Sequence, residues 1–374
     1  MRILYVTTIG LTMGFFDSYI RELLDEGHVV DIATNETDTK VPDCYREWGC
    51  TIYPIDTSRS PLNPGNLKAI RQIKELVSQN GYDIVHCHTP IAAMCTRLAC
   101  RSARKAGLKV LYTAHGFHFY KGAPLPNWLI FYPIEKICSY FTDVLITING
   151  EDYALARKKM KAKQIAYVPG VGVDIQKFQD TKIDRKEKRR ELDVPENAVL
   201  LVSVGELNQN KNHEVVIRAM AQLHNPRIHY MIAGEGPLRE HLHGLAQELD
   251  VSNQVHLLGY RKDIAQLCRA ADICVFPSIR EGLGLAAVEG MATGLPLIAS
   301  DNRGTRDYAV HRVNALVCRH DSVEEFADAI SQLAGNPGLR NEMGSKNVEI
   351  AKKYDIVSIN AQMKQLYAEV LANS

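Results

Sequence analysis

Short apolar runs alternate with longer amphipathic segments along the first half of the chain. The run at residues 3–7 predicts a buried strand, residues 15–25 predict a helix, and residues 28–34 predict the next strand. Two more strands are predicted at residues 83–86 and 109–113, each after a helical segment. This alternation indicates a parallel sheet that carries helices on both faces.

The same pattern restarts in the second half of the chain. The predicted strands lie at residues 198–204, 229–233, 255–258, 273–276 and 297–300, and the predicted helices at 213–223, 238–249 and 285–292. Between the halves, residues 169–196 show no period and hold a charged run at 182–191. We therefore place a boundary near Val173 and Asp174, which predicts an N-terminal domain at residues 1–173 and a C-terminal domain at 174–354.

The predicted fold class is α/β, with two Rossmann-like, doubly wound parallel-sheet domains. The last segment, residues 356–372, is helical by its apolar spacing. Open α/β sheets bind ligands at the carboxyl ends of their strands. Two such sheets facing each other predict a ligand cleft between the domains.

Composition narrows the class of protein and of partner. The 374 residues include 44 basic and 43 acidic side chains, and this even balance gives no reason to expect a nucleic acid as partner. Nine cysteines without a C-x-x-C pair favour reduced thiols. No secretory leader and no apolar run of about 18 residues is seen, so we expect a cytoplasmic protein, with a membrane surface still open as a contact.

The first candidate site is the segment 281–289, which follows a predicted strand and continues into a helix. Gly282 and Gly284 let backbone N–H groups approach a ligand, and the helix N-terminus favours an anion. Glu289 suits hydrogen bonds from a ribose diol, and Glu281 suits hydroxyls of a bound sugar. The alternative is a glycine-rich turn with two solvated glutamates.

The second candidate is the segment 205–211, which follows the predicted strand 198–204. Lys211 stands where the next helix opens, and the dipole of a helix repels a cation at that end. An anion bound between the two would explain the lysine. The alternative is a solvated surface lysine.

The first half offers one histidine as a catalytic candidate. His115 stands where the predicted strand 109–113 ends, although a structural hydrogen-bonding role is the alternative. His86 and His88 flank Cys87, but successive side chains of a strand point to opposite faces, so we do not expect this triplet to bind a metal.

Several nucleotide-binding signatures are missing. The loop 8–14 contains Gly10 and Gly14 but has neither the G-x-G-x-x-G spacing nor the P-loop pattern. NAD-dependent dehydrogenases and P-loop kinases are therefore disfavoured. No D-x-D pair is present to hold a divalent cation on a nucleoside diphosphate.

Together these segments resemble the GT-B type glycosyltransferases, specifically the retaining glycosyltransferase family 4 (group 1). The resemblance covers nearly the whole chain and is strongest in residues 205–211, 232–238 and 277–289, which include the E-x7-E spacing of Glu281 and Glu289. In the first half, residues 83–90 and 113–120 resemble a bacterial branch that builds capsular and exopolysaccharide.

The resemblance implies a transferase that uses a nucleotide-sugar, most often a UDP-sugar. It implies that Lys211 binds the diphosphate, Glu289 the ribose and Glu281 the donor sugar, and that His115 lies near the 6-position of that sugar. It also implies donor contacts from Gly14, from the backbone at Tyr260, Arg261 and Ile264, and from Gly205, Gly282, Leu283, Gly284 and Leu285. The family needs no metal, so no cofactor is expected. Residues 355–374 are expected to form a helix that crosses back to the first domain.

One position departs from the family. Glu206 stands where the family often has an arginine that binds the diphosphate. A carboxylate there repels the diphosphate, so we expect Glu206 to point away or to pair with a base. Arg303 or Arg306 is the hypothesised replacement.

The expected reaction moves a sugar to an acceptor hydroxyl with retention, and the acceptor is expected to be a lipid-linked glycan. Two basic clusters, residues 91–110 and 157–163, are either solvated faces or contacts for anionic lipid. A UDP-sugar 2-epimerase of the same fold and a non-catalytic scaffold of a polysaccharide assembly complex remain as alternatives.

Overall fold

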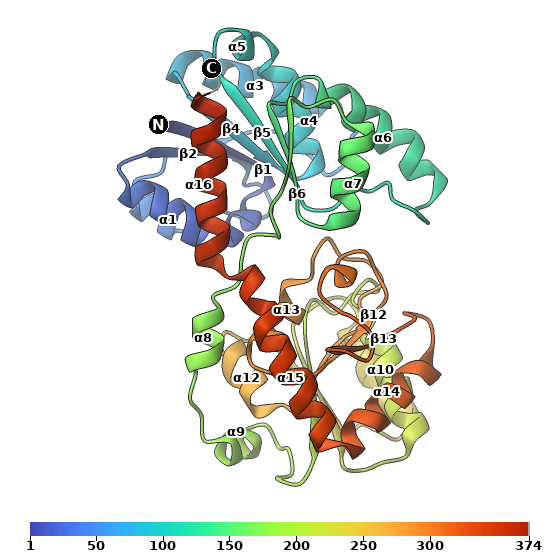
Figure 1. The fold of residues 1–374 in the computed structure, drawn as a ribbon. Helices are drawn as coiled ribbons and strands as arrows, with labels where there is room; N and C mark the ends of the chain where they lie inside the picture. The colour runs from blue at the N-terminus through green and yellow to red at the C-terminus, as the bar shows by residue number, and fades with distance from the viewer. Residues whose placement is uncertain (373–374) are drawn as a thin grey trace. The chain divides into compact units, whose positions relative to one another are not determined.

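The computed structural model describes residues 1–372, which divide into two compact units. The first unit comprises Met1–Val171 together with the segment from Ile359 onward, and the second comprises Gly172–Ser358 (Figure 1). The break lies within two residues of the boundary expected at 173/174. The end of the chain returns to the first unit, although the helix that makes this return begins in the second.

The first unit is built on a seven-stranded parallel sheet. Its strand order is β3-β2-β1-β4-β5-β6-β7. The strands are β1 (Arg2–Ile9), β2 (Val29–Asn35), β3 (Ile52–Pro54), β4 (Ile84–His88), β5 (Lys109–Ala114), β6 (Val144–Thr147) and β7 (Gln164–Tyr167). β1, β4, β5 and β6 are almost fully buried, as expected for central strands with helices on both faces.

Helices cover both faces of this sheet. One core contains side chains of α3 (Gly65–Asn80), α4 (Pro90–Ala99), α6 (Leu125–Ser139) and α7 (Gly150–Lys159). The other contains side chains of the 3-10 turn η1 (Gly10–Phe15), α1 (Asp17–Asp25), α2 (Cys44–Glu47) and α16 (Ile356–Ala372). α5 (Arg101–Lys105) is a short surface helix.

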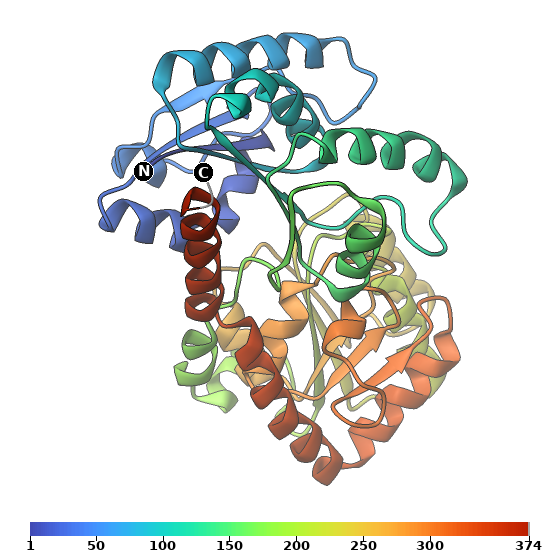
Figure 2. The ribbon, with the colours of Figure 1, turned by 45° about the horizontal axis from the view of Figure 1, so that its top comes forward.

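α16 lies along α1 in both ribbon views (Figures 1 and 2). The amide of Asn360 donates to Glu22 Oε1 at 2.6 Å, and Lys364 Nζ lies 2.9 Å from Glu26 Oε1. Below these polar contacts, Ile359 and Tyr367 are buried in the core of the first unit. The C-terminal helix is therefore an integral part of that unit.

The second unit repeats the design with six parallel strands. Their order is β10-β9-β8-β11-β12-β13. The strands are β8 (Val199–Val204), β9 (Ile228–Ala233), β10 (Val255–Gly259), β11 (Ile273–Phe276), β12 (Leu297–Ser300) and β13 (Ala315–Cys318). The helices are α8 (Ile175–Asp180), α9 (Arg185–Glu191), α10 (His213–Leu223), α11 (Arg239–Glu248), α12 (Ile264–Ala270), α13 (Leu285–Ala292), α14 (Val323–Gly335) and α15 (Pro337–Ala351).

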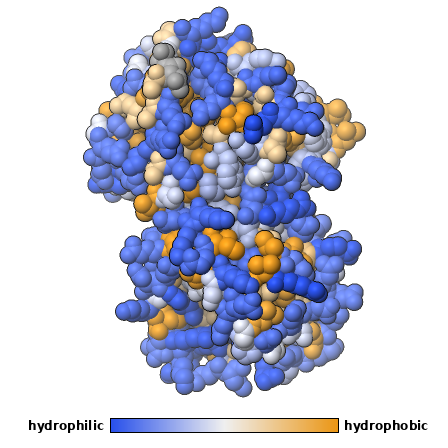
Figure 3. All heavy atoms as spheres, in the orientation of Figure 1, coloured by the Kyte–Doolittle hydropathy of each residue, from blue (hydrophilic) through white to orange (hydrophobic). Residues whose placement is uncertain are grey.

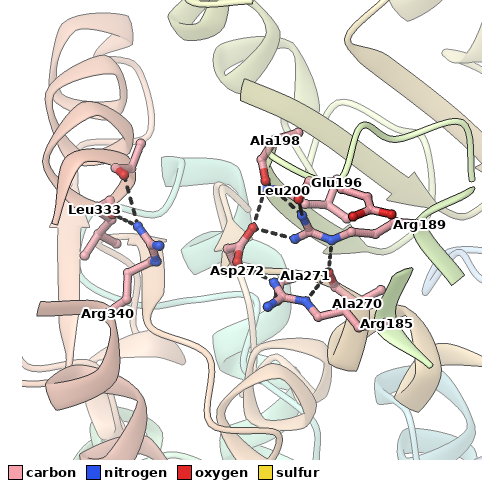
Figure 4. Close-up of polar contacts among 11 residues, drawn as sticks. Arg185, Arg189, Glu196, Ala198, Leu200, Ala270, Ala271, Asp272, Leu333 and Arg340 are labelled. Carbon is pink, nitrogen blue, oxygen red and sulfur yellow. Dashed lines mark hydrogen bonds and ion pairs between the residues drawn. The ribbon is translucent and has the colours of Figure 1, made fainter. Parts of the chain in front are cut away.

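An arginine clamp ties α9 to this sheet (Figure 4). Arg189 is buried, and its guanidinium donates to the carboxylate of Asp272 at 2.7 Å and to the carbonyls of Ala270 and Ala198 at 3.0 and 2.9 Å. Arg185 reaches the same carboxylate from the same helix. Asp272 also accepts the N–H of Leu200, at the start of β8. The clamp therefore holds the amino edge of the sheet, opposite the edge where ligands bind.

Both sheets have the strand order of a doubly wound fold, which confirms the predicted fold class. The order reverses between β1 and β4 in the first unit and between β8 and β11 in the second. In such sheets ligands bind outside the carboxyl ends of the strands, at these switch points. The loops that follow β1, β4, β8 and β11 are thus the places where a site is expected.

Candidate functional site

The switch point of the second sheet holds an ion pair between the two candidate segments. Lys211 follows β8 and Glu281 follows β11, and Lys211 Nζ lies 2.7 Å from Glu281 Oε1. The side chains are 22% and 15% exposed, so the pair is sheltered but remains accessible. Lys211 Nζ also lies 5.4 Å from the ring centroid of Phe276, the last residue of β11. The structure thus brings together two residues that lie 70 positions apart.

Two asparagines that the sequence did not single out hold these loops together. The side-chain amide of Asn210 donates to the carbonyl of Arg280 at 3.0 Å, and Ile279 N–H donates to the Asn210 carbonyl at 2.8 Å. Asn212 adopts the left-handed conformation, with φ 54°, and donates to the carbonyl of Pro277 at 3.2 Å. Asparagine is one of the few residues that tolerate this conformation, and this is the signal that marks the position.

Glycine is required where β11 turns into α13. Gly284 has φ 92°, and a Cβ atom there would lie 2.6 Å from the ring of Phe276. Tyr308 reinforces the turn by donating from its hydroxyl to the carbonyl of Leu283 at 2.9 Å. On the other loop, a Cβ atom at Gly205 would lie 3.2 Å from the side chain of Lys211. The side chain of Lys211 therefore packs against the backbone at Gly205, where a larger residue would crowd it.

Glu289 lies on α13, one turn after the helix begins. Burial raises the pKa of its carboxyl to about 7, and Lys177 on α8 opposes this rise. A carboxyl with this pKa changes charge near neutral pH. The surroundings of Glu289 therefore stabilise the neutral carboxyl relative to its usual state in water.

The residues expected at the nucleotide base lie between β10 and α12. Tyr260 is 71% exposed, and Ile264 is the first residue of α12. Arg261 donates to Asp263 at 2.6 and 2.7 Å and to Glu191 at 3.1 Å. The Arg261 side chain is thus held by neighbouring carboxylates, which leaves only its backbone for the expected contact with the base.

Glu206 is exposed and accepts a hydrogen bond from the side-chain amide of Asn208 at 2.9 Å. Of the two arginines expected to replace the missing cation, Arg303 is 5% exposed and its Nε lies 3.4 Å from the carbonyl of Glu281. Arg306 Nε binds Asp301 at 2.7 Å on the surface. Arg303 is therefore the better placed of the two beside the Glu281 loop.

At the switch point of the first sheet, the loops after β1 and β4 are bound to each other. The hydroxyls of Thr8 and Thr89 lie 2.6 Å apart, and Thr8 N–H donates to Thr89 Oγ1 at 3.1 Å. Thr89 has φ 64°, a strained conformation for a β-branched residue, and such strain is often found at functional sites. Gly14 lies on η1, which directly follows β1, and is exposed.

A pocket of about 190 Å³ opens at this edge of the first sheet. Its lining combines threonine hydroxyls with apolar side chains, and Arg59 is the cation among them. The lining residues are Thr8, Ile9, Thr12, Arg59, Thr89, Pro90, Ile91, His118 and Phe131. This mixture suits a sugar, which presents hydroxyls at its rim and C–H groups on its faces.

His115 belongs to a cluster of three histidines at the ends of β4 and β5. His115 Nε2 lies 3.1 Å from Nδ1 of His88, and the His88 ring centroid lies 4.2 Å from that of His86. His86 and His88 are two positions apart on β4 and share one face of the strand, whereas Cys87 packs in the core on the other face. Successive side chains of β4 do point to opposite faces, which places Cys87 away from the histidines, but His86 and His88 remain together on one face.

Within residues 1–372, no group of three or more histidine, cysteine, aspartate or glutamate side chains is arranged to hold a metal ion. In the same residues, no helix is both long enough and apolar enough to cross a membrane.

In the first of the two basic clusters, residues 91–110, most of the cations are buried or paired with carboxylates. Arg97 is fully buried and paired with Glu135 at 2.8 Å, and Arg104 binds Asp143 through two nitrogens. Lys109 is also buried. The second cluster, which comprises Arg157, Lys158, Lys159, Lys161 and Lys163, is exposed throughout. Arg97, Arg104 and Lys109 therefore form neither the solvated face nor the lipid contact that the sequence left open for residues 91–110.

Comparison with known proteins adds the family context. Residues 184–349 match the family described as glycosyl transferases group 1, and residues 2–149 match glycosyl transferase 4-like proteins. EpsD of Bacillus subtilis strain 168, provisionally named a glycosyltransferase, is 37% identical over 372 residues, which are 98% of this chain and 96% of EpsD.

Two further matches extend over most of the chain. The Escherichia coli UDP-Gal:alpha-D-GlcNAc-diphosphoundecaprenol alpha-1,3-galactosyltransferase is 28% identical over 349 residues, with 88% of this chain and 89% of that enzyme covered. The crystal structure of Anabaena HepE in complex with UDP aligns over 99% of this chain and 100% of HepE, with a TM-score of 0.81 at 21% identity. The likeness to HepE concerns the fold.

Proposed function

The chain belongs to the group 1 glycosyltransferases, and we propose that it transfers a sugar from a UDP-sugar, with retention at the anomeric carbon, to a lipid-linked glycan. The observation that carries the donor half of this proposal is the ion pair of Lys211 and Glu281 at the switch point of the second sheet. The choice of UDP as the nucleotide of the sugar donor is supported by the UDP-bound HepE structure and by the UDP-Gal enzyme of E. coli.

In this proposal each donor group has a defined partner. The ammonium group of Lys211 binds the diphosphate, and the carboxylate of Glu281 accepts hydroxyls of the sugar. Glu289 accepts the ribose hydroxyls, and the backbone of residues 282–285 at the start of α13 faces the phosphates, where the helix dipole favours negative charge. The bound donor thus takes Lys211 away from the carboxylate that holds it in the free protein.

The chemical barrier is the separation of an oxocarbenium-like sugar from the diphosphate. Lys211 and the N-terminus of α13 stabilise the charge that develops on the leaving phosphate, and such preorganised electrostatics often dominate catalysis. The leaving phosphate accepts the proton of the acceptor hydroxyl on the same face of the sugar, so no separate base is required.

We propose that the reaction requires no metal, because the protein's own cation and helix dipole neutralise the diphosphate. Turnover in excess EDTA should therefore equal turnover with added Mg²⁺. A loss of activity in EDTA that Mg²⁺ restores would contradict this part of the proposal.

The activity is tested by UDP release from a panel of UDP-sugars, with and without a membrane extract that supplies acceptor. We expect release to require the extract, and to be lost in Lys211→Ala and Glu281→Ala. Product formed without acceptor would favour a UDP-sugar 2-epimerase instead. Neither turnover nor UDP-sugar binding would favour the non-catalytic scaffold.

The acceptor half of the proposal places a glycan of cell-surface polysaccharide on the first unit. The relative from E. coli acts on an undecaprenol-linked GlcNAc diphosphate, and the pocket at β1 and β4 combines hydroxyls, apolar walls and Arg59. We expect Arg59→Ala to raise KM for the acceptor at least several-fold while KM for the donor stays unchanged. Equal changes in both constants would contradict this assignment.

A lipid-linked acceptor requires contact with a membrane, and α6 has a suitable surface. Leu125, Leu129, Ile130 and Ile137 are exposed along the helix, in the part of the first unit where Figure 3 shows apolar side chains at the surface. Lys136 of α6 donates to the carbonyl of Lys159, so this apolar strip adjoins the exposed basic cluster 157–163. Each such cation near anionic lipid contributes about 1 kcal/mol.

Vesicle sedimentation tests this contact. We expect binding to phosphatidylglycerol vesicles that weakens with salt and is lost in Leu129→Glu, and little binding to phosphatidylcholine vesicles. Binding that is unchanged at 1 M salt would contradict the electrostatic part.

We also propose that Arg303 supplies the second cation for the diphosphate, in place of the arginine that Glu206 replaces. Arg303→Gln should weaken UDP binding much more than Arg239→Gln, which changes an exposed arginine of α11. Equal effects, or an effect of Arg306→Gln larger than that of Arg303→Gln, would count against it.

A further inference from the structure

The hydrogen bond between His88 and His115 constrains the protons of both rings. A neutral imidazole has one nitrogen that donates and one that accepts, so in a bond between two neutral histidines one ring donates and the other accepts. Burial lowers the pKa of His115 to about 4 and that of His88 well below its ordinary value. Both rings are therefore neutral near pH 7, and only two proton arrangements are open to the pair.

The second nitrogen of His88 decides between the two arrangements. His88 Nε2 is buried and has no hydrogen-bond partner among the described residues. Buried N–H groups without an acceptor are rare in folded proteins, whereas an unused acceptor is tolerated more often. The proton of His88 therefore lies on Nδ1, where it is donated to His115 Nε2 at 3.1 Å.

The proton of His115 follows from this assignment. Since His115 Nε2 accepts, its proton lies on Nδ1, which is the less populated tautomer of a free histidine side chain. His115 Nδ1 makes no hydrogen bond within the described residues and is not one of their buried, unpartnered atoms. It is thus an accessible N–H donor at the carboxyl end of β5.

The surroundings of His88 hold its ring in one orientation. The ring stacks on Tyr5, with centroids 5.4 Å apart and planes 16° apart, and packs against Phe16 with centroids 4.3 Å apart. The neighbouring ring of His86 is itself fixed, since Tyr367 of α16 and Thr113 of β5 bind its two nitrogens at 2.7 and 2.8 Å. A half-turn of the His88 ring would put carbon Cδ2 in the place of Nδ1 and break the bond to His115 Nε2, so this bond favours the observed orientation.

We propose that His88 is a positioning residue, which fixes His115 as the Nδ1–H tautomer so that His115 donates a hydrogen bond to an oxygen of the substrate and does not accept a proton from it. This inference rests on the proposed function for the identity of that oxygen, a hydroxyl or bridging oxygen of the donor sugar. The tautomer itself is independent of it. The outer partner of a functional imidazole commonly selects its tautomer in this way.

The test measures the tautomer first and activity second. Nitrogen NMR of the protein labelled with ¹⁵N-histidine distinguishes a protonated Nδ1 from a protonated Nε2, and His115→Gln identifies the His115 signals. We expect the Nδ1–H form in the native protein near pH 7. In His88→Leu we expect mainly the Nε2–H form, whereas His88→Asn should keep Nδ1–H, because the asparagine amide can donate from the position of Nδ1.

The chain offers a matched control in the second unit. His229 Nδ1 and His256 Nε2 lie 3.0 Å apart on neighbouring strands, and His229 is buried like His88. His229→Leu removes the same kind of bond away from the first sheet, and it should change neither the tautomer of His115 nor turnover. Unfolding midpoints of all variants show whether each is folded.

For turnover, we expect His88→Leu to lower kcat about 10-fold or more with KM for the donor changed less than 3-fold, and His88→Asn to restore most of kcat. A native His115 in the Nε2–H form would overturn the proposal whatever the activity. So would a His88→Leu protein that is folded and retains the native tautomer. If the tautomers behave as expected while no variant transfers sugar, the proposed function fails and the tautomer assignment stands.

Discussion

Replacing Glu289 by glutamine should stabilise the protein, by an amount that grows as the pH rises above about 4.5. Burial raises the pKa of this carboxyl to about 7 from the ordinary value of 4.5, which it regains when the chain unfolds. Below pH 4.5 the carboxyl is neutral in both states. As the pH rises from 4.5 to 7, the unfolded chain ionises first, so folding stability falls.

The size of the effect follows from these two values. Raising a pKa from 4.5 to about 7 costs the native state about 3 kcal/mol once the pH exceeds both values. Glutamine keeps the shape of the neutral carboxyl and carries no charge at any pH. Relative to the native protein, Glu289→Gln should therefore gain about 1 kcal/mol at pH 5 and about 3 kcal/mol at pH 8.

Urea unfolding at pH 5 and pH 8 measures this difference. Glu240→Gln, which changes an exposed glutamate in the first turn of α11, should give the same small difference at both pH values. The reasoning is refuted if Glu289→Gln shows a difference that does not grow with pH, or if it is less stable than the native protein at pH 8.

The same carboxyl links pH to donor binding. An ionised carboxylate accepts two ribose hydroxyls, so UDP should bind the native protein more tightly as the pH rises through 7. Titration of the UDP phosphate itself contributes to this slope, and subtracting the slope of Glu289→Gln removes that contribution. Parallel slopes for the two proteins would contradict a contact between Glu289 and the ribose.

Three further substitutions test the packing behind the site. Arg97→Met leaves Glu135 buried without its cation and should lower the free energy of unfolding by about 3 to 5 kcal/mol, measured in urea. Adding Glu135→Leu to the same chain should restore most of this loss. Additive losses would refute the pairing. Gly284→Ala adds a Cβ atom 2.6 Å from the Phe276 ring, on a residue with φ 92°. We expect the free energy of unfolding to fall by roughly 1 to 3 kcal/mol and UDP to bind more weakly. Native-like values of both would refute the steric argument. Asn210→Ala frees the Arg280 loop and should weaken UDP binding by calorimetry more than it lowers the unfolding midpoint, whereas the reverse order would make Asn210 a purely structural residue.

The sequence predicted helices and strands well where the hydrophobic pattern was regular and was bounded by residues that end such elements. The helices at 213–223, 285–292 and 356–372 and the strands at 273–276 and 297–300 agree with the structure to the residue. Each has an apolar face or run and is bounded by glycine, proline or polar residues. These are the conditions under which hydrophobic periodicity identifies an element.

The sequence was less informative where apolar residues have no clear period. The stretch from Trp128 to Ile148 contains most of α6, which has a proline inside it, and then the whole of β6. α6 exposes apolar side chains on one side and buries others, so its sequence shows no amphipathic pattern. The buried role of Arg97 was also out of reach, because its partner Glu135 lies 38 positions away on another helix.

The candidate site shows the same division. The strand order that places Lys211 and Glu281 at one switch point follows from the doubly wound pattern, but the ion pair between them does not follow from it. Asn210 and Asn212 were missed because their contacts join loops that are distant in sequence. The hydrogen bond between His88 and His115 depends on side chains that β1, β4, β5 and α16 bring together. No local sequence pattern predicts such a contact.

The account's central claim is that Lys211 binds the donor diphosphate while Glu281 binds the donor sugar. Calorimetric titration with UDP, which has the diphosphate but no sugar, separates these two roles. Lys211→Ala should lose at least 10-fold in UDP affinity, because it leaves Glu281 uncompensated beside the phosphates. Glu281→Gln should bind UDP at least as tightly as the native protein, because Lys211 is no longer held at 2.7 Å by a competing carboxylate, and should still fail to release UDP from a UDP-sugar. A Glu281→Gln protein that loses UDP affinity as severely as Lys211→Ala would contradict the claim.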